Sequence, residues 1–267
     1  MRKLSISQAW EETRAVLAHD GKLIGTVALA LLVVPGLIVE VVMPAAPRGE
    51  MPAPGTWVAV GLAGFLVTLA GQLSIVRLAM GPPISVGEAI VHGARRTLPL
   101  VGAFLIWALP LVLAISTLYA VVRADPAHPS GPAALLMLAL SLLGIFLAIR
   151  LLLVGPVASG EPVGPIAILK RSWEITAGNW WRLFGFIMLF FIAALVFLYA
   201  TTSVLGLLAK MFLGGVEPLS AGWLVVILVS QVLTALLYTV LFVMQARLYV
   251  QRAAGDETGS GIPISGI

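Results

Sequence analysis

The sequence predicts an all-α, polytopic integral membrane protein with six transmembrane helices. Its 267 residues are 60% hydrophobic and only 10% charged, whereas an ordinary soluble domain is about 25% charged. Six apolar runs are each long enough to cross a hydrocarbon core of ~30 Å, which takes about 20 residues of helix. These runs cover residues 23–43, 56–80, 98–122, 133–154, 183–208 and 222–249. We therefore expect a single membrane domain over residues 1–252 and a flexible cytoplasmic tail, rich in Gly and Ser, over 253–267.

An amphipathic segment over residues 5–20 precedes the first apolar run. Four of its residues recur at helical spacing on one face: Ile6, Trp10, Thr13 and Leu17. Ser5 and Gln8 have the spacing of a capping box, which indicates that a helix begins here. The charged residues of this segment differ from the apolar core of a cleavable signal peptide, so we expect the first apolar run to stay in the mature protein.

This arrangement occurs three times along the chain, with a period of roughly 80 residues. Ser85 and Glu88 form a second capping box, and Pro165 begins a third amphipathic segment. Each copy then consists of a cytoplasmic surface helix, a spanning helix and a return helix, so the fold is predicted to be three helical hairpins. The copies cover residues 5–80, 84–155 and 164–252. Pro35 and Pro110 lie within the first spanning helices of the first two copies and are expected to kink them.

The third copy begins in a Gly/Pro-rich stretch, Gly155 to Gly185, which is predicted to form a turn, a short surface helix and an interfacial belt of Trp residues. Gly164 and Pro165 suit the N-cap and first turn of a helix, and Gly178 suits its end. The expected buried face consists of Ile166, Leu169, Trp173 and Thr176. The signature positions of the stretch are Gly164, Pro165, Ser172, Trp173, Thr176, Gly178 and Trp181.

The pattern of these signature residues resembles that of the membrane-domain family named after glycerophosphoryl diester phosphodiesterases. It is also similar to that of related bacterial six-helix membrane proteins. In the namesake proteins this domain accompanies a separate catalytic barrel with metal-bound carboxylates and histidines. Nothing in this chain matches that barrel, so no catalytic residue is carried over. The resemblance implies a bacterial inner-membrane protein with a role in envelope homeostasis or transport.

Orientation in the membrane follows from the distribution of Lys and Arg. Thirteen of the sixteen basic residues fall on one side of the predicted spans, and Arg48, Arg123 and Lys210 fall on the other. Because cytoplasmic loops carry an excess of Lys and Arg, both termini and all three surface helices are predicted to be cytoplasmic.

No feature of the sequence indicates an enzyme, a metal site or a cofactor. The chain contains no Cys, which excludes disulfides and thiolate chemistry. Its three His residues are not spaced as metal ligands, and no phosphate-binding or nucleophile motif is present. The net charge of +4 is spread over the membrane edges, so nucleic acid is not an expected partner.

Basic residues near the cytoplasmic ends of the helices are candidate contacts for lipid headgroups. Each return helix carries an Arg-Leu pair near its end, beginning at Arg77, Arg150 and Arg247. These residues either anchor the topology by snorkelling or converge on a phosphate, unless they pair with Glu88, Glu161 or Glu174. The full set of candidate headgroup contacts is Arg77, Arg150, Arg247, Lys170, Arg171 and Arg182.

Gln72 and Gln231 lie within spanning runs, where they either line a polar path or form hydrogen bonds between helices. A lining role favours a protein of lipid homeostasis or one that transports a lipid or amphiphilic solute. The alternative is a membrane anchor or regulatory module that binds a partner enzyme through the surface helices. Membrane phospholipids are expected partners in both cases, and the sequence leaves the oligomeric state open.

Overall fold

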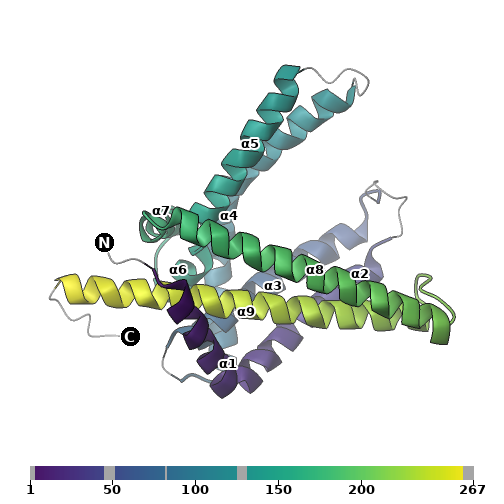
Figure 1. Cartoon of the computed structure of the whole chain (residues 1–267), viewed down its shortest axis with the longest axis horizontal. Coiled ribbons are helices and arrows are strands. Elements are labelled where there is room, and N and C mark those ends of the chain that lie inside the picture. Colours follow the sequence, from purple (N-terminus) through teal and green to yellow (C-terminus); the bar gives the residue numbers. More distant parts are fainter. Residues whose placement is uncertain (1–3, 45–51, 82, 125–130, 261–267) are drawn as a thin grey trace.

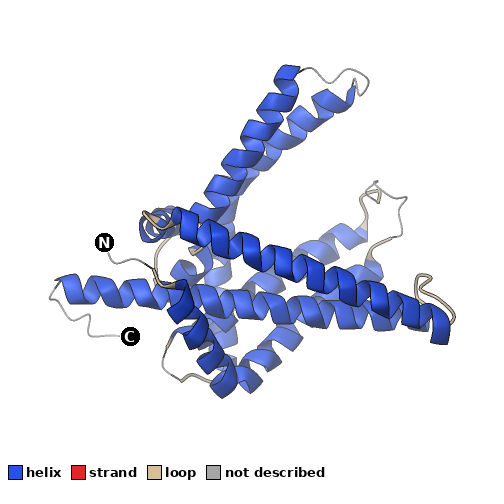
Figure 2. Ribbon diagram, in the orientation of Figure 1, coloured by secondary structure: helices blue, strands red, loops and turns tan. Residues whose placement is uncertain are grey.

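The computed structural model describes residues 4–44, 52–81, 83–124 and 131–260, and in these ranges all regular structure is helical, without a strand (Figures 1 and 2). The elements are α1 Ile6–Ala28, the π-helix η1 Leu29–Val33, α2 Val34–Val42, α3 Thr56–Met80, α4 Val86–Ala124, α5 Gly131–Arg150, α6 Val154–Gly160, α7 Pro165–Thr176, α8 Trp180–Phe212 and α9 Ala221–Ser260.

Six helical stretches in the described part of the chain are long and apolar enough to cross a membrane, as the sequence predicts. They are Ile6–Val42, Thr56–Met80, Val86–Ala120, Gly131–Gly160, Trp180–Phe212 and Ala221–Ala253. Many large apolar side chains on these helices point outward, for example Leu62, Leu113 and Leu195. Outward apolar surface of this extent suits contact with lipid, so the fold is that of a multi-pass membrane protein.

The predicted boundary between surface helix and spanning helix is wrong for the first two copies. Helical structure continues from Ile6 to Val42 without a break, and α4 is a single helix from Val86 to Ala124. Only in the third copy do two helices form, α7 and α8. Gly178 makes this break because it adopts φ +77°, a left-handed conformation that residues with a side chain rarely take.

A widened turn lies just before Pro35, where the sequence predicts a kink. Proline has no N–H, so the turn before it cannot keep the usual α-helical bonding. The N–H of Val34 instead bonds to the carbonyl of Leu29, five residues earlier, and residues Leu29–Val33 form the π-helix. By contrast, Pro99 and Pro110 both lie inside the continuous helix α4.

The stretch predicted as a Gly/Pro-rich turn after residue 154 contains a short buried helix, α6. Helix α5 ends at Arg150, and after a turn at Leu151–Leu153 the chain forms Val154–Gly160. Pro156 is tolerated there because the first N–H groups of a helix have no partner within it. Gly155 lets α6 approach α3 closely, since a Cβ at this position would lie 2.8 Å from Nε2 of Gln72.

Helix α6 packs against α3, α4, α7 and α9 and completes one of two hydrophobic clusters. That cluster includes Leu73, Leu100, Val157, Ile168 and Leu248. The second cluster joins α1, α3 and α9 through Ile24, Val76 and Val243. Figure 1 shows α4 and α5 as a hairpin that points away from α8 and α9, so the cores lie at the opposite end of that hairpin.

The first and last described helices meet at the end of the bundle where α6 lies. Nε of Arg247 in α9 lies 2.8 Å from Oε2 of Glu12 in α1. The backbone N–H of Ser5 donates to Oε1 of Gln251 at 3.4 Å. The start of α1 and the last third of α9 are therefore held together, and they bring polar residues to one end of the spans.

Candidate functional site

A polar pocket of about 200 Å³ lies at this end of the bundle, between α3, α4 and the connection from α6 to α7. Its lining consists of Arg77, His92, Arg96, Ser159, Gly160, Glu161 and Pro162. Two guanidinium groups and an imidazole therefore face a space that contains a single carboxylate. Such a lining suits an anion, and no group of three or more acidic or His side chains that could hold a metal occurs in the described ranges.

His92 and Arg96 stand one turn apart on α4 and bond to the carboxyl end of α6. His92 Nε2 donates to the Ser159 carbonyl at 2.8 Å, and Arg96 Nε donates to the Ala158 carbonyl at 2.7 Å. Arg96 Nη2 also bonds to the carbonyls of Glu161 and Val163. The carbonyls of Ala158 and Ser159 lie in the last turn of α6, where carbonyls lack helical partners and carry partial negative charge, so cations suit them.

The carboxylate of Glu161 is held by two donors from other helices. Its Oε1 accepts from Arg171 Nε at 3.2 Å and from the Tyr249 hydroxyl at 2.9 Å. The ring of Tyr249 also lies against Gly160, where a Cβ would stand 3.0 Å from the ring. Because Arg171 neutralises Glu161, the positive charges of Arg77 and Arg96 remain without a counterion from the pocket lining.

Arg77 is the cation of this pocket with the most donors to spare. It lies in the last turn of α3, and among the described residues its guanidinium forms no hydrogen bond or ion pair. A guanidinium has five N–H donors in a planar fork that matches the oxygens of a carboxylate or phosphate. The arrangement therefore places a guanidinium whose donors are not used by the described residues at this end of the bundle, where it can bind an anion.

Arg150 lies in a different environment, against the aromatic residues that begin the third copy. Its guanidinium carbon is 4.7 Å from the ring centroid of Trp173 and 5.6 Å from that of Phe146. Its carbonyl accepts from the hydroxyls of Ser172 and Thr176, at 3.3 and 2.9 Å. Two of its nitrogens, Nε and Nη1, are buried and have no hydrogen-bond partner. These contacts explain three signature positions, Ser172, Trp173 and Thr176, as the support of α7 on the end of α5.

The predicted buried face of α7 is wrong for Ile166 and Trp173, whereas Thr176 is buried as expected and Leu169 packs against the core. Its buried residues are Ile168, Ser172, Ile175 and Thr176, whereas Ile166 is 73% and Trp173 39% exposed. The helix is rotated relative to the expectation because small hydroxyl side chains, rather than the largest apolar ones, meet the carbonyl of Arg150. Of the remaining signature residues, Gly164 is the N-cap, Pro165 the first helical residue, and Trp181 is 77% exposed.

The other candidate headgroup contacts lie apart from the pocket. Arg247 pairs with Glu12, rather than with the carboxylates considered from the sequence, and also donates to the Ala79 carbonyl at 3.3 Å. Arg182 donates to the Leu4 carbonyl at 3.4 Å, and Lys170 is exposed on α7. The three arginines of the repeated Arg-Leu pairs therefore occupy three different settings, and only Arg77 lines the pocket.

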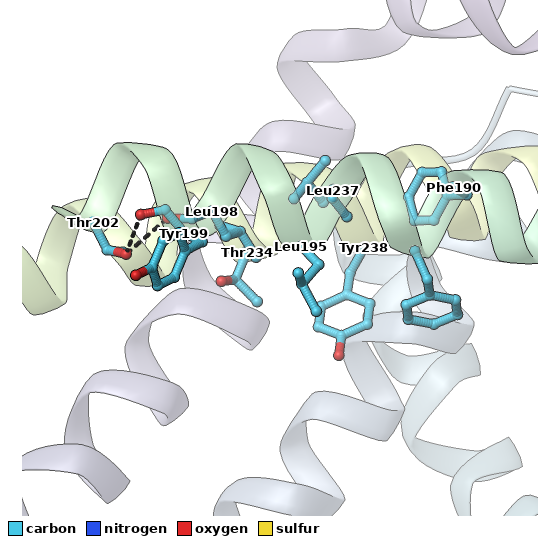
Figure 3. Close-up of a pocket in the computed structure, with 10 residues that line it drawn as sticks. Phe190, Leu195, Leu198, Tyr199, Thr202, Thr234, Leu237 and Tyr238 are labelled. Carbon is cyan, nitrogen blue, oxygen red and sulfur yellow. Dashed lines mark hydrogen bonds between the residues drawn. The ribbon is translucent and has the colours of Figure 1, made fainter. Parts of the chain in front are cut away.

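Two larger pockets are apolar and run along helices. One, of about 430 Å³, lies between α8 and α9 (Figure 3); its lining includes Phe190, Leu195 and Tyr238. In that view the Thr202 hydroxyl bonds to the backbone of its own helix. The other, of about 450 Å³, lies between α1 and α9 and is lined by Ile24, Ala28 and Val232 among others.

Gln72 and Gln231 line none of these three pockets. The amide of Gln72 packs against Gly155, and that of Gln231 packs against Gly36. Both glutamines therefore fill places where a second helix approaches closely, which fits interhelical packing better than a lining role.

Sequence reasoning missed His92, Arg96 and Tyr249 as site residues. The spacing of His92 and Arg96 was a usable signal, because residues four apart share one face of a helix. Their partner, α6, was not foreseen as a helix, so nothing indicated what that face would meet. Tyr249 reaches Glu161 across 88 residues, a contact that only the tertiary fold creates.

The fold and the pocket together define a class: a multi-pass membrane protein with a cationic pocket at one end of its helices. The chain belongs to the family described as Domain of unknown function (DUF7847), whose family model matches residues 4–252. That match covers every element of the site. No curated protein and no solved structure matches the chain. The family match does not name the glycerophosphoryl diester phosphodiesterase membrane domain, so that resemblance stays a prediction.

Proposed function

We propose that this protein is a non-enzymatic protein of the bacterial inner membrane that binds the phosphate headgroup of a lipid, in lipid homeostasis or in transport of a lipid or amphiphilic solute. The observation that carries the proposal is Arg77, a guanidinium that lines a pocket and has no partner among the described residues. An anionic oxygen would satisfy its donors with charge-assisted hydrogen bonds.

The size of the pocket supports a headgroup rather than a whole small molecule. Pockets for drug-sized ligands usually enclose about 300–1,000 Å³, whereas this one is about 200 Å³. A lipid needs only its polar group there, since its chains stay among the spanning helices. The two apolar pockets along α9 offer surfaces suited to such chains.

We also propose the finer topology: three hairpins in a threefold repeat, each preceded by a cytoplasmic surface segment, with both termini cytoplasmic. The charge distribution supports it, as does the meeting of the start of α1 with the end of α9. Reporter fusions after Gly55 and Gly131 are expected to report the outside, and a fusion after Gly255 the inside. A periplasmic signal from the last fusion would contradict this topology.

Lipid retention tests the proposed function directly. The full chain is purified in mild detergent, and phospholipid retained per protein is counted by native mass spectrometry. Arg77→Gln is expected to lose most of the retained anionic phospholipid, because the neutral amide cannot hold a phosphate by charge. Lys170→Gln is the matched control, since it removes an exposed basic residue outside the pocket. Equal retention in wild type and both variants, with all three folded, would refute the proposal.

A second candidate function is a membrane anchor or regulatory module for a partner protein. The observation that favours it is the exposed apolar surface at the start of the third copy, with Ile166 and Trp181 more than two-thirds exposed. Ile166→Ser is expected to release a partner without changing lipid retention. Loss of lipid retention in Ile166→Ser, with no partner released, would instead favour contact of this surface with the membrane.

A further inference from the structure

We infer that the ligand of the Arg77 pocket is a phosphomonoester, a terminal phosphate with a single ester bond, rather than a phosphodiester. This inference rests on the proposed function only for the source of the phosphate, a lipid headgroup. The chemistry itself follows from the charges and donors of the pocket, which would also suit free phosphate.

The charge of the lining is the first argument. Arg77 and Arg96 both line the pocket, and the carboxylate of Glu161 is already paired with Arg171. Two positive charges are therefore left to be balanced. A phosphodiester carries one negative charge, whereas a phosphomonoester carries about −1.5 to −2 at pH 7. The second charge of the monoester therefore has a counterpart in this pocket.

The donors available in the pocket are the second argument. Arg96 uses Nε and Nη2 on backbone carbonyls in and just after the last turn of α6, which fixes its guanidinium but leaves Nη1 without a hydrogen-bond partner among the described residues. Arg77 contributes its whole fork. A monoester presents three terminal oxygens and can accept from both guanidinium groups, whereas a diester presents only two.

The walls of the pocket are the third argument. Ser159, Gly160 and Glu161 close one side, and they are fixed by His92, Arg96 and Tyr249. Because three side chains form hydrogen bonds to this wall, moving it to make room for the second substituent of a diester would break those bonds. A monoester has only one substituent that must leave the pocket. Its three terminal oxygens can then all face Arg77 and Arg96.

The experiment compares two anionic lipids that share their acyl chains but differ in this chemistry. Full-length protein is placed in nanodiscs of phosphatidylcholine that contain either phosphatidic acid, a monoester, or phosphatidylglycerol, a diester. Lipid retained after extraction into detergent is counted by native mass spectrometry. We expect about fivefold more phosphatidic acid than phosphatidylglycerol, as one further charge contact predicts. Arg77→Gln is expected to remove this preference, and Lys170→Gln to keep it. A third arm measures the thermal stability of detergent-purified protein with inorganic phosphate.

Each outcome separates this inference from the proposed function. Equal retention of the two lipids, lowered alike in Arg77→Gln, would overturn the monoester inference and leave headgroup binding standing. Stabilisation by inorganic phosphate in wild type but not in Arg77→Gln, with neither lipid retained, would support the monoester chemistry and overturn the lipid function. No retention of either lipid and no effect of inorganic phosphate would overturn both.

Discussion

The closest helix contact near the site predicts a sharp difference between two glycine substitutions in α4. A Cβ on Gly93 would overlap the carbonyl oxygen of Ala70 and approach the backbone nitrogen of Ser74 to 3.1 Å. These obstacles are backbone atoms of α3, so no change of rotamer can relieve the overlap. Gly93→Ala is therefore expected to push α4 away from α3, at a cost of about 1–3 kcal/mol in the free energy of unfolding.

Gly87 is the matched control because it lies in the same helix and a Cβ there would have no other atom within 4 Å. Gly87→Ala is expected to leave the free energy of unfolding unchanged or to raise it by up to about 1 kcal/mol, because Ala is the better helix former. The measurement is unfolding of the detergent-purified protein by increasing SDS, followed by circular dichroism. Since His92 adjoins Gly93, binding of inorganic phosphate is expected to weaken only in Gly93→Ala. Equal stability of the two variants would refute the close α3–α4 contact.

Three further predictions concern single side chains. Ile168→Ala is expected to lower the free energy of unfolding by about 2–5 kcal/mol, since Ile168 is fully buried. Ile166→Ala, on the exposed face of the same helix, is expected to change it little. The same SDS titration measures both. Glu12→Gln is expected to destabilise the protein, because it leaves the partly buried Arg247 without its carboxylate. Thermal unfolding in detergent measures this effect. An unchanged unfolding temperature would contradict the pairing of Glu12 with Arg247. Arg150→Met is expected to keep or raise stability, because two guanidinium nitrogens of Arg150 are buried without partners; a large loss of stability would show that its charge is required.

Length and hydropathy were sufficient to predict the six spans, because the hydrocarbon thickness sets helix length whatever the neighbours. Residues 56–80 match α3 at both ends. The capping box of Ser85 and Glu88 is confirmed, with both reciprocal bonds formed. Gly178 ends its helix in the left-handed conformation that was expected. Such local signals act within a few residues, so the sequence alone contains them.

Features that depend on contacts between distant segments were not predicted. A helix at Val154–Gly160 contradicts the local Gly and Pro content, and it forms because α3, α4, α7 and α9 enclose it. The buried face of α7 depends on the carbonyl of Arg150, which no hydrophobic pattern reports. Arg77 was identified as a candidate from its repeated position in the sequence. What sets it apart is that residues of other helices contact the guanidinium groups of Arg150 and Arg247 but leave the donors of Arg77 unused. The sequence alone does not show this difference.

The contacts between the two ends of the described chain have a consequence for biosynthesis. Glu12 leaves the ribosome 235 residues before Arg247, and Ser5 leaves it 246 residues before Gln251. At about 5–20 residues per second, this delay is on the order of ten to fifty seconds. During that interval the start of α1 lacks the helix that later holds it. A nascent chain arrested before α9 is therefore expected to leave position 12 open to a water-soluble thiol reagent, tested with Glu12→Cys in this otherwise cysteine-free chain. Extending the chain through α9 is expected to slow that labelling, because a helix made late in synthesis secures the start of α1.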